Sequence, residues 1–270
     1  MIKKGYLIAI DLDGTLVHGF NNYDNECINL IKEIAKDNYV IIATGRPYRS
    51  SKYYYDLLGL KTPIINYNGS LVHHPLDNNF PKTMITVNKD DIFDFFNDNK
   101  EDLVNIFCEV EDEIFLWKKQ DDIGPYLHTE GGNLHLGDIT KTLKENPNGA
   151  IVFSKPNTGK KLQKYIDNKY KGQLLIRFWD NENYVISEIY NPLTTKGNGL
   201  KRIINYLNVP YDKTIAIGDG HNDIEIFNEC SLSVAMGNSH PELLKHADIT
   251  IKTVYENGVY YFLKNFFYND

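Results

Sequence analysis

The sequence predicts an α/β protein that consists of a doubly wound parallel sheet and an inserted α+β domain. Short strands that are apolar throughout alternate with helical patterns in residues 1–70, and the same alternation returns after residue 190. Such strands are typical of a parallel sheet, because helices cover both of its faces. The residues in between alternate apolar and polar side chains, which indicates an antiparallel sheet. We therefore expect a Rossmann-like core that is interrupted by a second domain.

In the N-terminal part, apolar runs predict three strands, at residues 6–10, 39–43 and 63–67. Apolar residues at helical spacing predict helices between these strands, at residues 27–35 and around residues 54–58. Strands and helices that follow one another in this way build the first half of a parallel α/β sheet.

The C-terminal part begins with a helix whose apolar residues fall at i, i+3, i+4 and i+7: Leu200, Ile203, Ile204 and Leu207. Three strands are predicted after it, at residues 214–217, 232–235 and 248–251. Helices are expected around residues 223–229 and from Pro241, since proline suits a first helical turn. An apolar segment follows at residues 259–267.

The middle of the chain has a different pattern. Alternating runs predict strands at residues 84–87, 103–110, 114–117, 150–153, 174–179 and 184–189. Two helical patterns lie among them, at residues 90–97 and 159–165. We therefore expect a core domain of residues 1–81 plus 191–270, and an inserted domain of residues 82–190.

The composition argues against two classes of function, nucleic-acid binding and membrane spanning. The 270 residues are 42% hydrophobic and 24% charged, which is ordinary for a globular protein. The net charge of −7 disfavours nucleic acid as a partner, because an acidic surface repels phosphate backbones. Apolar runs such as residues 6–10 are far shorter than the roughly 20 residues that span a membrane, and this run ends too early for a signal peptide. We expect a cytoplasmic protein without membrane contact.

The number and spacing of the cysteines are typical of a protein in a reducing compartment. Cys27, Cys108 and Cys230 lie far apart and form no CxxC pair. This spacing predicts separate buried thiols, and it argues against disulfides and against a zinc site.

A pair of carboxylates follows the first predicted strand, in Asp11-Leu12-Asp13-Gly14-Thr15. Asp11 and Asp13 would point the same way if the strand continued, and Gly14 allows a sharp turn. Two close carboxylates are costly to bury unless a cation compensates them, and oxygen ligands suit Mg²⁺. The pattern predicts a magnesium site; the alternative is a turn in which Asp and Gly serve the backbone alone.

A second acidic pair follows the strand at residues 214–217, in Gly218-Asp219-Gly220-His221-Asn222-Asp223. Asp and Asn are favoured at helix starts, so helix capping explains Asp223 without any further function. It explains Asp219 less well, because this residue lies at the strand end between two glycines.

Two further segments carry groups that can bind an anion. Thr44 and Gly45 end the second strand, where a hydroxyl and backbone N–H groups can hold a phosphoryl oxygen. Lys196 starts the amphipathic helix, where a cation is unfavourable unless an anion compensates it. Each segment has a simpler alternative interpretation. Thr44-Gly45 could be an ordinary strand-to-helix turn, and Lys196 could be a solvated lysine.

Topology joins these segments. In a doubly wound sheet the first strand lies at the switch point, beside the second strand and the strand after the crossover. This order brings Asp11, Thr44 and Asp219 to one edge of the sheet. Lys196 begins the helix that leads into the Asp219 strand. We therefore expect one site.

Together, these motifs resemble those of the haloacid dehalogenase superfamily, most closely its Cof-type branch, subclass IIB, which carries a large C2 cap. Asp11-x-Asp13-Gly14-Thr15 resembles motif I, Thr44 in Ala-Thr-Gly-Arg motif II, Lys196-Gly197 motif III, and Gly218 to Asp223 motif IV. Three other segments fit the same branch: Asn68-Gly69, residues 234–238 and residues 256–259. The resemblance runs over nearly the whole chain and is weakest in the inserted domain.

The resemblance implies a role for each residue. Asp11 would be the nucleophile that forms an aspartyl-phosphate, and Asp13 the general acid and base. Mg²⁺ would be held by the Asp11 carboxylate, the Asp13 backbone carbonyl and Asp219, with Asp223 in support. Thr44, Gly45, Lys196 and Asn222 would bind the phosphoryl oxygens.

The resemblance also implies an activity. The chain would be a phosphoric monoester hydrolase whose substrates are small phosphorylated metabolites, sugar phosphates among them. An Asp-x-Asp pair favours a phosphatase or a phosphomutase, because the superfamily's dehalogenases lack the second acid and its ion-pumping ATPases carry Thr. A phosphomutase and a non-catalytic metabolite-binding protein remain the alternatives.

Overall fold

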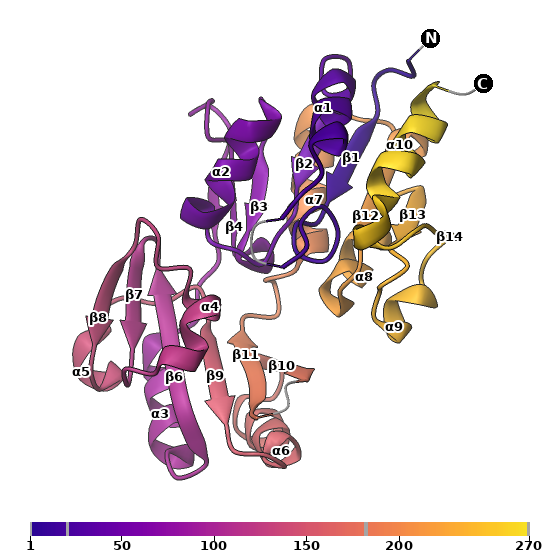
Figure 1. The fold of residues 1–270 in the computed structure, drawn as a ribbon. Coiled ribbons are helices and arrows are strands. Elements are labelled where there is room, and N and C mark those ends of the chain that lie inside the picture. Colours follow the sequence, from indigo (N-terminus) through magenta and orange to yellow (C-terminus); the bar gives the residue numbers. More distant parts are fainter. Residues whose placement is uncertain (1, 20–21, 181–182, 269–270) are drawn as a thin grey trace. The chain divides into compact units, whose positions relative to one another are not determined.

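The computed structural model describes residues 2–19, 22–180 and 183–268 (Figure 1). They form two compact units. One unit combines the residues up to Thr83 with those from Thr195 onward, and the other runs from Met84 to Thr194. The first unit is an α/β structure with a parallel sheet, and the second has its own sheet and helices. The predicted fold class is confirmed.

The α/β unit is built on a parallel sheet in the order β14-β13-β12-β1-β2. Its strands are β1 (Leu7–Ile10), β2 (Tyr39–Ile42), β12 (Thr214–Gly218), β13 (Leu232–Ala235) and β14 (Ile249–Thr250). A parallel bridge from Ala43 to Ile65 joins β3 (Ile64–Asn66) to the end of β2. The strand β3 also pairs with β4 (Leu71–His73), in a small sheet that includes β5 (Thr83–Met84).

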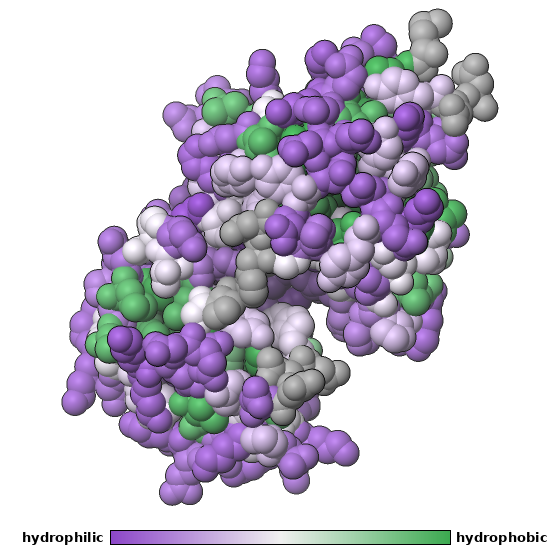
Figure 2. All heavy atoms as spheres, in the orientation of Figure 1, coloured by the Kyte–Doolittle hydropathy of each residue, from purple (hydrophilic) through white to green (hydrophobic). Residues whose placement is uncertain are grey.

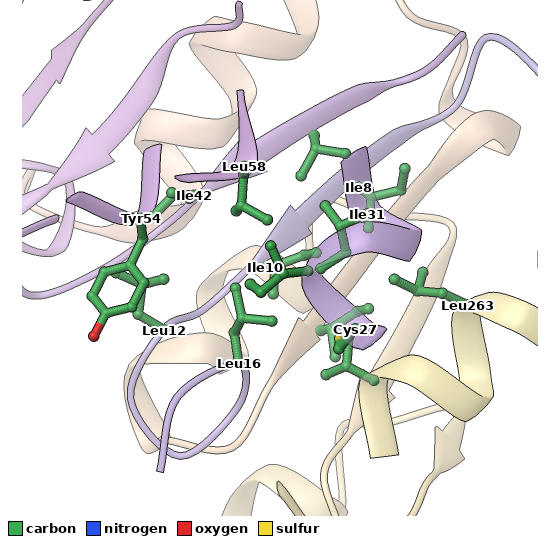
Figure 3. Packing of buried hydrophobic residues seen from close by; sticks show 14 of the residues in the cluster. Ile8, Ile10, Leu12, Leu16, Cys27, Ile31, Ile42, Tyr54, Leu58 and Leu263 are labelled. Atoms are coloured by element: carbon green, nitrogen blue, oxygen red, sulfur yellow. The ribbon is translucent and has the colours of Figure 1, made fainter. Parts of the chain in front are cut away.

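Helices cover both faces of the parallel sheet (Figure 1). Ile8 and Ile10 of β1 pack on one face with α1 (Asn25–Ile34), α2 (Tyr48–Leu58) and α10 (Gly258–Tyr268), as Figure 3 shows. Leu7 and Ala9 pack on the other face with α7 (Lys196–Leu207), α8 (Ile224–Phe227) and α9 (Pro241–Leu244). Successive side chains of a strand point to opposite faces, so both faces of β1 are apolar and buried.

The position of β1 determines where the functional residues lie. It pairs in parallel with β12 on one side and β2 on the other, with Ile10 opposite both Ile217 and Ile42. The carboxyl ends of three neighbouring strands therefore meet at one edge of the sheet, as the predicted switch-point order requires.

The inserted unit contains a six-stranded sheet in the order β10-β11-β9-β6-β7-β8. Its strands are β6 (Leu103–Val110), β7 (Glu113–Leu116), β8 (Asn133–Leu136), β9 (Ala150–Ser154), β10 (Leu175–Asp180) and β11 (Val185–Tyr190). Its helices are α3 (Lys89–Asn99), α4 (Gly124–Leu127), α5 (Ile139–Thr142) and α6 (Gly159–Tyr170). Phe95 and Phe96 of α3 and Leu162 and Ile166 of α6 lie in the apolar core of this unit.

Two expectations for this unit were wrong in detail. The sheet is antiparallel except for β8, which pairs in parallel with β7. All four residues of β8 are exposed, so no buried face produces a pattern in the sequence. Residues 84–87 form no separate strand beyond Met84 in β5, because Val87 donates its N–H to Pro147 outside any strand ladder.

The prediction for the cysteines agrees with the structure. Cys27, Cys108 and Cys230 are buried free thiols. Within the described residues, no helix is both long and apolar enough to cross a membrane. Figure 2 shows hydrophilic side chains over most of the visible face.

Candidate active site

Asp11 lies directly after β1, at the carboxyl edge of the parallel sheet. Its backbone N–H donates to Ile217 O of β12 at 3.1 Å, which fixes the chain beside the neighbouring strand. The following turn depends on Gly14, whose φ of +80° suits glycine. A Cβ atom at Gly14 would lie 2.1 Å from Asp219 Oδ2. The turn therefore brings the backbone of motif I against the carboxylate of Asp219.

Lys196 is the first residue of α7 and is buried, at 1% exposure. The hydroxyl of Thr195 caps the helix by accepting from Asn198 N–H. The N–H of Lys196 donates to Glu225 Oε2 at 2.9 Å. Its ammonium group donates to Asp11 Oδ1 and to Asp223 Oδ1, each at 2.7 Å. Lys196 thus joins the first and last acidic segments of the site.

Asp219 and Asp223 follow β12, and hydrogen bonds hold them together. Asp223 Oδ2 accepts from the N–H groups of Asp219 and Gly220, at 3.0 and 2.9 Å. Asp219 Oδ1 accepts from the hydroxyl of Thr15 at 2.9 Å. Asp223 therefore supports both the Lys196 side chain and the backbone that carries the Asp219 carboxylate. This arrangement goes beyond helix capping.

Burial and mutual repulsion dominate the electrostatics. Burial raises the pKa of Asp11, the charge of Lys196 opposes this, and the neighbouring carboxylates raise it further. Burial and the charge of Asp223 raise the pKa of Asp219 to about 7. Burial disfavours the charge of Lys196, but Asp11 and Asp223 outweigh this and raise its pKa above the ordinary value. The acids of the site therefore carry an electrostatic cost that one ammonium group does not remove.

The residues fit a divalent cation. One carboxylate oxygen from each of Asp11, Asp219 and Asp223 lies within 4.8 Å of the others. Three carboxylates against one ammonium leave a formal charge of −3 + 1 = −2, which a divalent ion balances. Oxygen donors of this kind suit Mg²⁺. The geometry is thus compatible with the predicted magnesium site.

Thr44 and Gly45 lie after β2, at the same edge of the sheet. Thr44 is fully buried, and its hydroxyl accepts from the N–H of Arg46 at 3.1 Å. Asn68 connects this loop to motif IV: its N–H donates to Thr44 O, and its side-chain oxygen accepts from Asn222 Nδ2 at 2.8 Å. A Cβ atom at Gly45 would lie 3.2 Å from Asn68 Oδ1. The loop with Thr44 and Gly45 is therefore linked to Asn222 through Asn68.

Asp13 differs from the expectation for a continuing strand. The strand β1 ends at Ile10, and the Asp13 carboxylate is not among the three that cluster. Its side chain is 51% exposed and forms an ion pair with both Nε and Nη2 of Arg46. The strand therefore does not continue through Asp13, whose carboxylate contacts Arg46 while its charge still acts on Asp11 and Asp219.

Sequence reasoning gave no role to several residues that hold the site. The Thr15 hydroxyl donates to the Asp219 carboxylate, and the Glu225 carboxylate accepts from the N–H of Lys196. Asn238 donates to Gly14 O at 2.8 Å and accepts from Val254 N–H at 2.8 Å, so it fastens the motif I turn. Thr15 lies in motif I and Asn238 in the segment 234–238, whereas Glu225 lies in no named motif. All three reach their partners only through the fold.

Comparisons with known proteins show the family to which the chain belongs. The sequence model of the haloacid dehalogenase-like hydrolases matches residues 8–263. The chain is 32% identical to the 5-amino-6-(5-phospho-D-ribitylamino)uracil phosphatase YitU of Bacillus subtilis, over 99% of each chain. It is 24% identical to the phosphatase YwpJ of the same organism, over 96% of this chain and 99% of YwpJ.

Solved structures show the same fold. A haloacid dehalogenase-like hydrolase from Bacteroides thetaiotaomicron superposes with a TM-score of 0.83 at 19% identity, over 98% of this chain and 100% of the other. The subclass IIB sugar phosphatase BT4131 superposes with a TM-score of 0.79 at 19% identity, over 97% and 98%. Family match, related phosphatases and acidic site together mean that the chain belongs to the haloacid dehalogenase-like hydrolases, as a phosphatase of phosphorylated small molecules.

Proposed function

We propose that the protein is a Mg²⁺-dependent phosphatase that hydrolyses small phosphate monoesters through an aspartyl-phosphate on Asp11. The observation that carries the proposal is the buried contact of Lys196 with Asp11 and Asp223, beside Asp219, at the carboxyl edge of the sheet. Such a site brings a nucleophile, a buried ammonium group and acidic oxygens together at one edge of the sheet.

The first step transfers the phosphoryl group to the protein. An Asp11 carboxylate oxygen attacks phosphorus, the bond from phosphorus to the ester oxygen breaks, and Asp13 gives that oxygen a proton. Asp13 is suited to this exchange because its carboxylate lies outside the cluster and is half exposed.

The second step releases phosphate. Asp13, now ionised, takes a proton from water as the water oxygen attacks phosphorus. The bond between phosphorus and Asp11 breaks, and the Asp11 carboxylate is restored. Lys196, Thr44, the Gly45 N–H and Asn222 would stabilise the phosphoryl oxygens, where the transition state concentrates its charge.

Asp11, Asp219 and the backbone carbonyl of Asp13 would hold Mg²⁺, with Asp223 in support. When bound, the cation lowers the repulsion between an anionic nucleophile and an anionic substrate. The carboxylates of Asp11, Asp219 and Asp223 form the acidic cluster whose negative charge Lys196 balances only in part.

The substrate class we propose is sugar phosphates and related phosphorylated polyols. YitU, which is 32% identical over nearly the full length, is named for a phosphoribityl compound. This compound is therefore the first substrate to test, together with hexose and pentose phosphates.

Phosphate release from this panel, with Mg²⁺ and with EDTA, tests the proposal. We expect turnover that EDTA abolishes and that Asp11→Asn lowers by at least about 1,000-fold, while circular dichroism stays unchanged. Asp56→Asn is the matched control, because Asp56 is an exposed carboxylate that pairs with Lys52 on α2. Full turnover in Asp11→Asn would overturn the mechanism, and an isomerised sugar phosphate without free phosphate would indicate a phosphomutase instead.

A further inference from the structure

Arg46 makes a two-point contact with Asp13. Its Nε donates to Asp13 Oδ2 at 2.8 Å, and its Nη2 donates to Asp13 Oδ1. Both carboxylate oxygens are therefore held by one planar group, which fixes the orientation of the carboxylate as well as its position. A lysine at this position would supply a point charge without that geometry.

The guanidinium group is itself held in place. Arg46 is only 5% exposed, although its partner Asp13 is 51% exposed. Its guanidinium carbon lies 5.4 Å from the centre of the Tyr54 ring, and Tyr54 is fully buried in the core shown in Figure 3. Its carbonyl oxygen accepts from Asn66 Nδ2 and from Tyr67 N–H, at 3.0 and 3.2 Å.

The difference in exposure between Arg46 and Asp13 indicates which of the two residues positions the other. A buried charge is retained at a cost unless it has partners, and one partner of Arg46 is the half-exposed carboxylate of Asp13, which lies outside the acidic cluster. Arg46 is the buried member of the pair, and Asp13 is the half-exposed member. Arg46 therefore acts on Asp13, rather than the reverse.

We propose that Arg46 is a positioning residue that orients the Asp13 carboxylate for proton exchange with the ester oxygen and the attacking water. The inference rests on the proposed function, because it takes Asp13 as the acid and base. Arg46 itself need not touch the substrate: it acts through the two hydrogen bonds to Asp13.

The choice of leaving group tests this role. An alkyl phosphate needs a proton on its leaving oxygen, whereas p-nitrophenyl phosphate releases a stable anion. We expect Arg46→Met to lower kcat/KM for an alkyl phosphate at least about 10-fold more than for p-nitrophenyl phosphate. We expect Arg46→Lys to recover part of the difference. Lys52→Met, which removes an exposed ion pair from the neighbouring helix, is the control and should match the unmodified protein.

A double-mutant cycle separates positioning from a general structural effect. If Arg46 acts through Asp13, the Arg46→Met change should have less than about a twofold effect in an Asp13→Asn background. An equal loss on both esters, or the same loss with and without Asp13, would overturn the inference. In that case turnover that still requires Asp11 and Mg²⁺ would leave the proposed phosphatase intact, whereas an inactive unmodified protein would overturn both.

Discussion

Lys196 Nζ lies 2.7 Å from Asp11 Oδ1, although the two residues are 185 positions apart in the chain. The same ammonium group reaches Asp223 at 2.7 Å, so one side chain connects three segments of the α/β unit. Buried ion pairs of this kind cost desolvation, and the fold retains this one where several carboxylates meet. The contact therefore indicates a site that binds charged ligands. It is not evidence that the ion pair makes the fold more stable than an apolar pair would.

Replacing Lys196 by Met should affect both stability and turnover. The change leaves Asp11 and Asp223 buried without their cation, and we expect unfolding free energy to fall by about 3–5 kcal/mol and phosphate release to fall at least about 100-fold. Urea unfolding and a phosphate assay measure the two effects. Lys201→Met is the control, because Lys201 is an exposed residue of the same helix whose partner Glu229 is 3.7 Å away. A Lys196→Met protein as stable and active as the original would contradict the role of the contact.

Gly14 and Gly59 form a matched pair for testing the turn after Asp11. Both have positive φ, +80° and +63°, but only at Gly14 would a Cβ atom meet Asp219 Oδ2; at Gly59 nothing lies within 4 Å. Each Gly→Ala change should cost about 1 kcal/mol of backbone strain. We expect Gly14→Ala alone to lower phosphate release and the thermal shift produced by Mg²⁺. Equal effects of the two substitutions would show that the close approach of Gly14 to Asp219 is unimportant.

Much of the fold and of the site could be predicted because the signals are local. The strands at residues 6–10, 39–43 and 214–217 are short apolar runs, and parallel sheets bury both faces of a strand. Once β1 is placed between its neighbours, Asp11 and Asp219 must share one edge of the sheet. The convergence of these residues follows from strand order, without knowledge of any side-chain geometry.

The unpredicted part depends on turns and on contacts between distant residues. The pairing of Asp13 with Arg46 arises because β1 ends at Ile10 and the chain turns before Asp13. Asn68 has a φ of +53° within a run of left-handed residues, and this conformation aims it at Asn222. Neither local propensity nor periodicity encodes these contacts. The exposed strand β8 was missed for a related reason, since it buries none of its residues.

Asp219→Asn should separate metal binding from the electrostatic cost of gathering several carboxylates. Burial and Asp223 disfavour the charge of Asp219, so removing that charge should raise the melting temperature of the metal-free protein near pH 8. The same change removes a carboxylate from the proposed Mg²⁺ set, so the rise in melting temperature on adding Mg²⁺ should shrink. Thermal melts with EDTA and with Mg²⁺ measure both. A metal-free melting temperature that falls, or an undiminished Mg²⁺ response, would contradict this account.

His73 provides a pH dependence outside the site. Burial, with the charges of Lys82 and His74, lowers the pKa of His73 from 6.5 to about 4, and its ring lies edge-on to Tyr48. The unfolded chain therefore binds a proton between pH 6.5 and 4 that the folded chain does not, and stability falls as pH falls through this window. After allowance for partial exposure, His73 should account for about 1–2 kcal/mol of this loss. Urea unfolding at pH 7 and pH 4.5 should show a correspondingly smaller loss in His73→Phe, and an equal loss in both proteins would rule out this contribution.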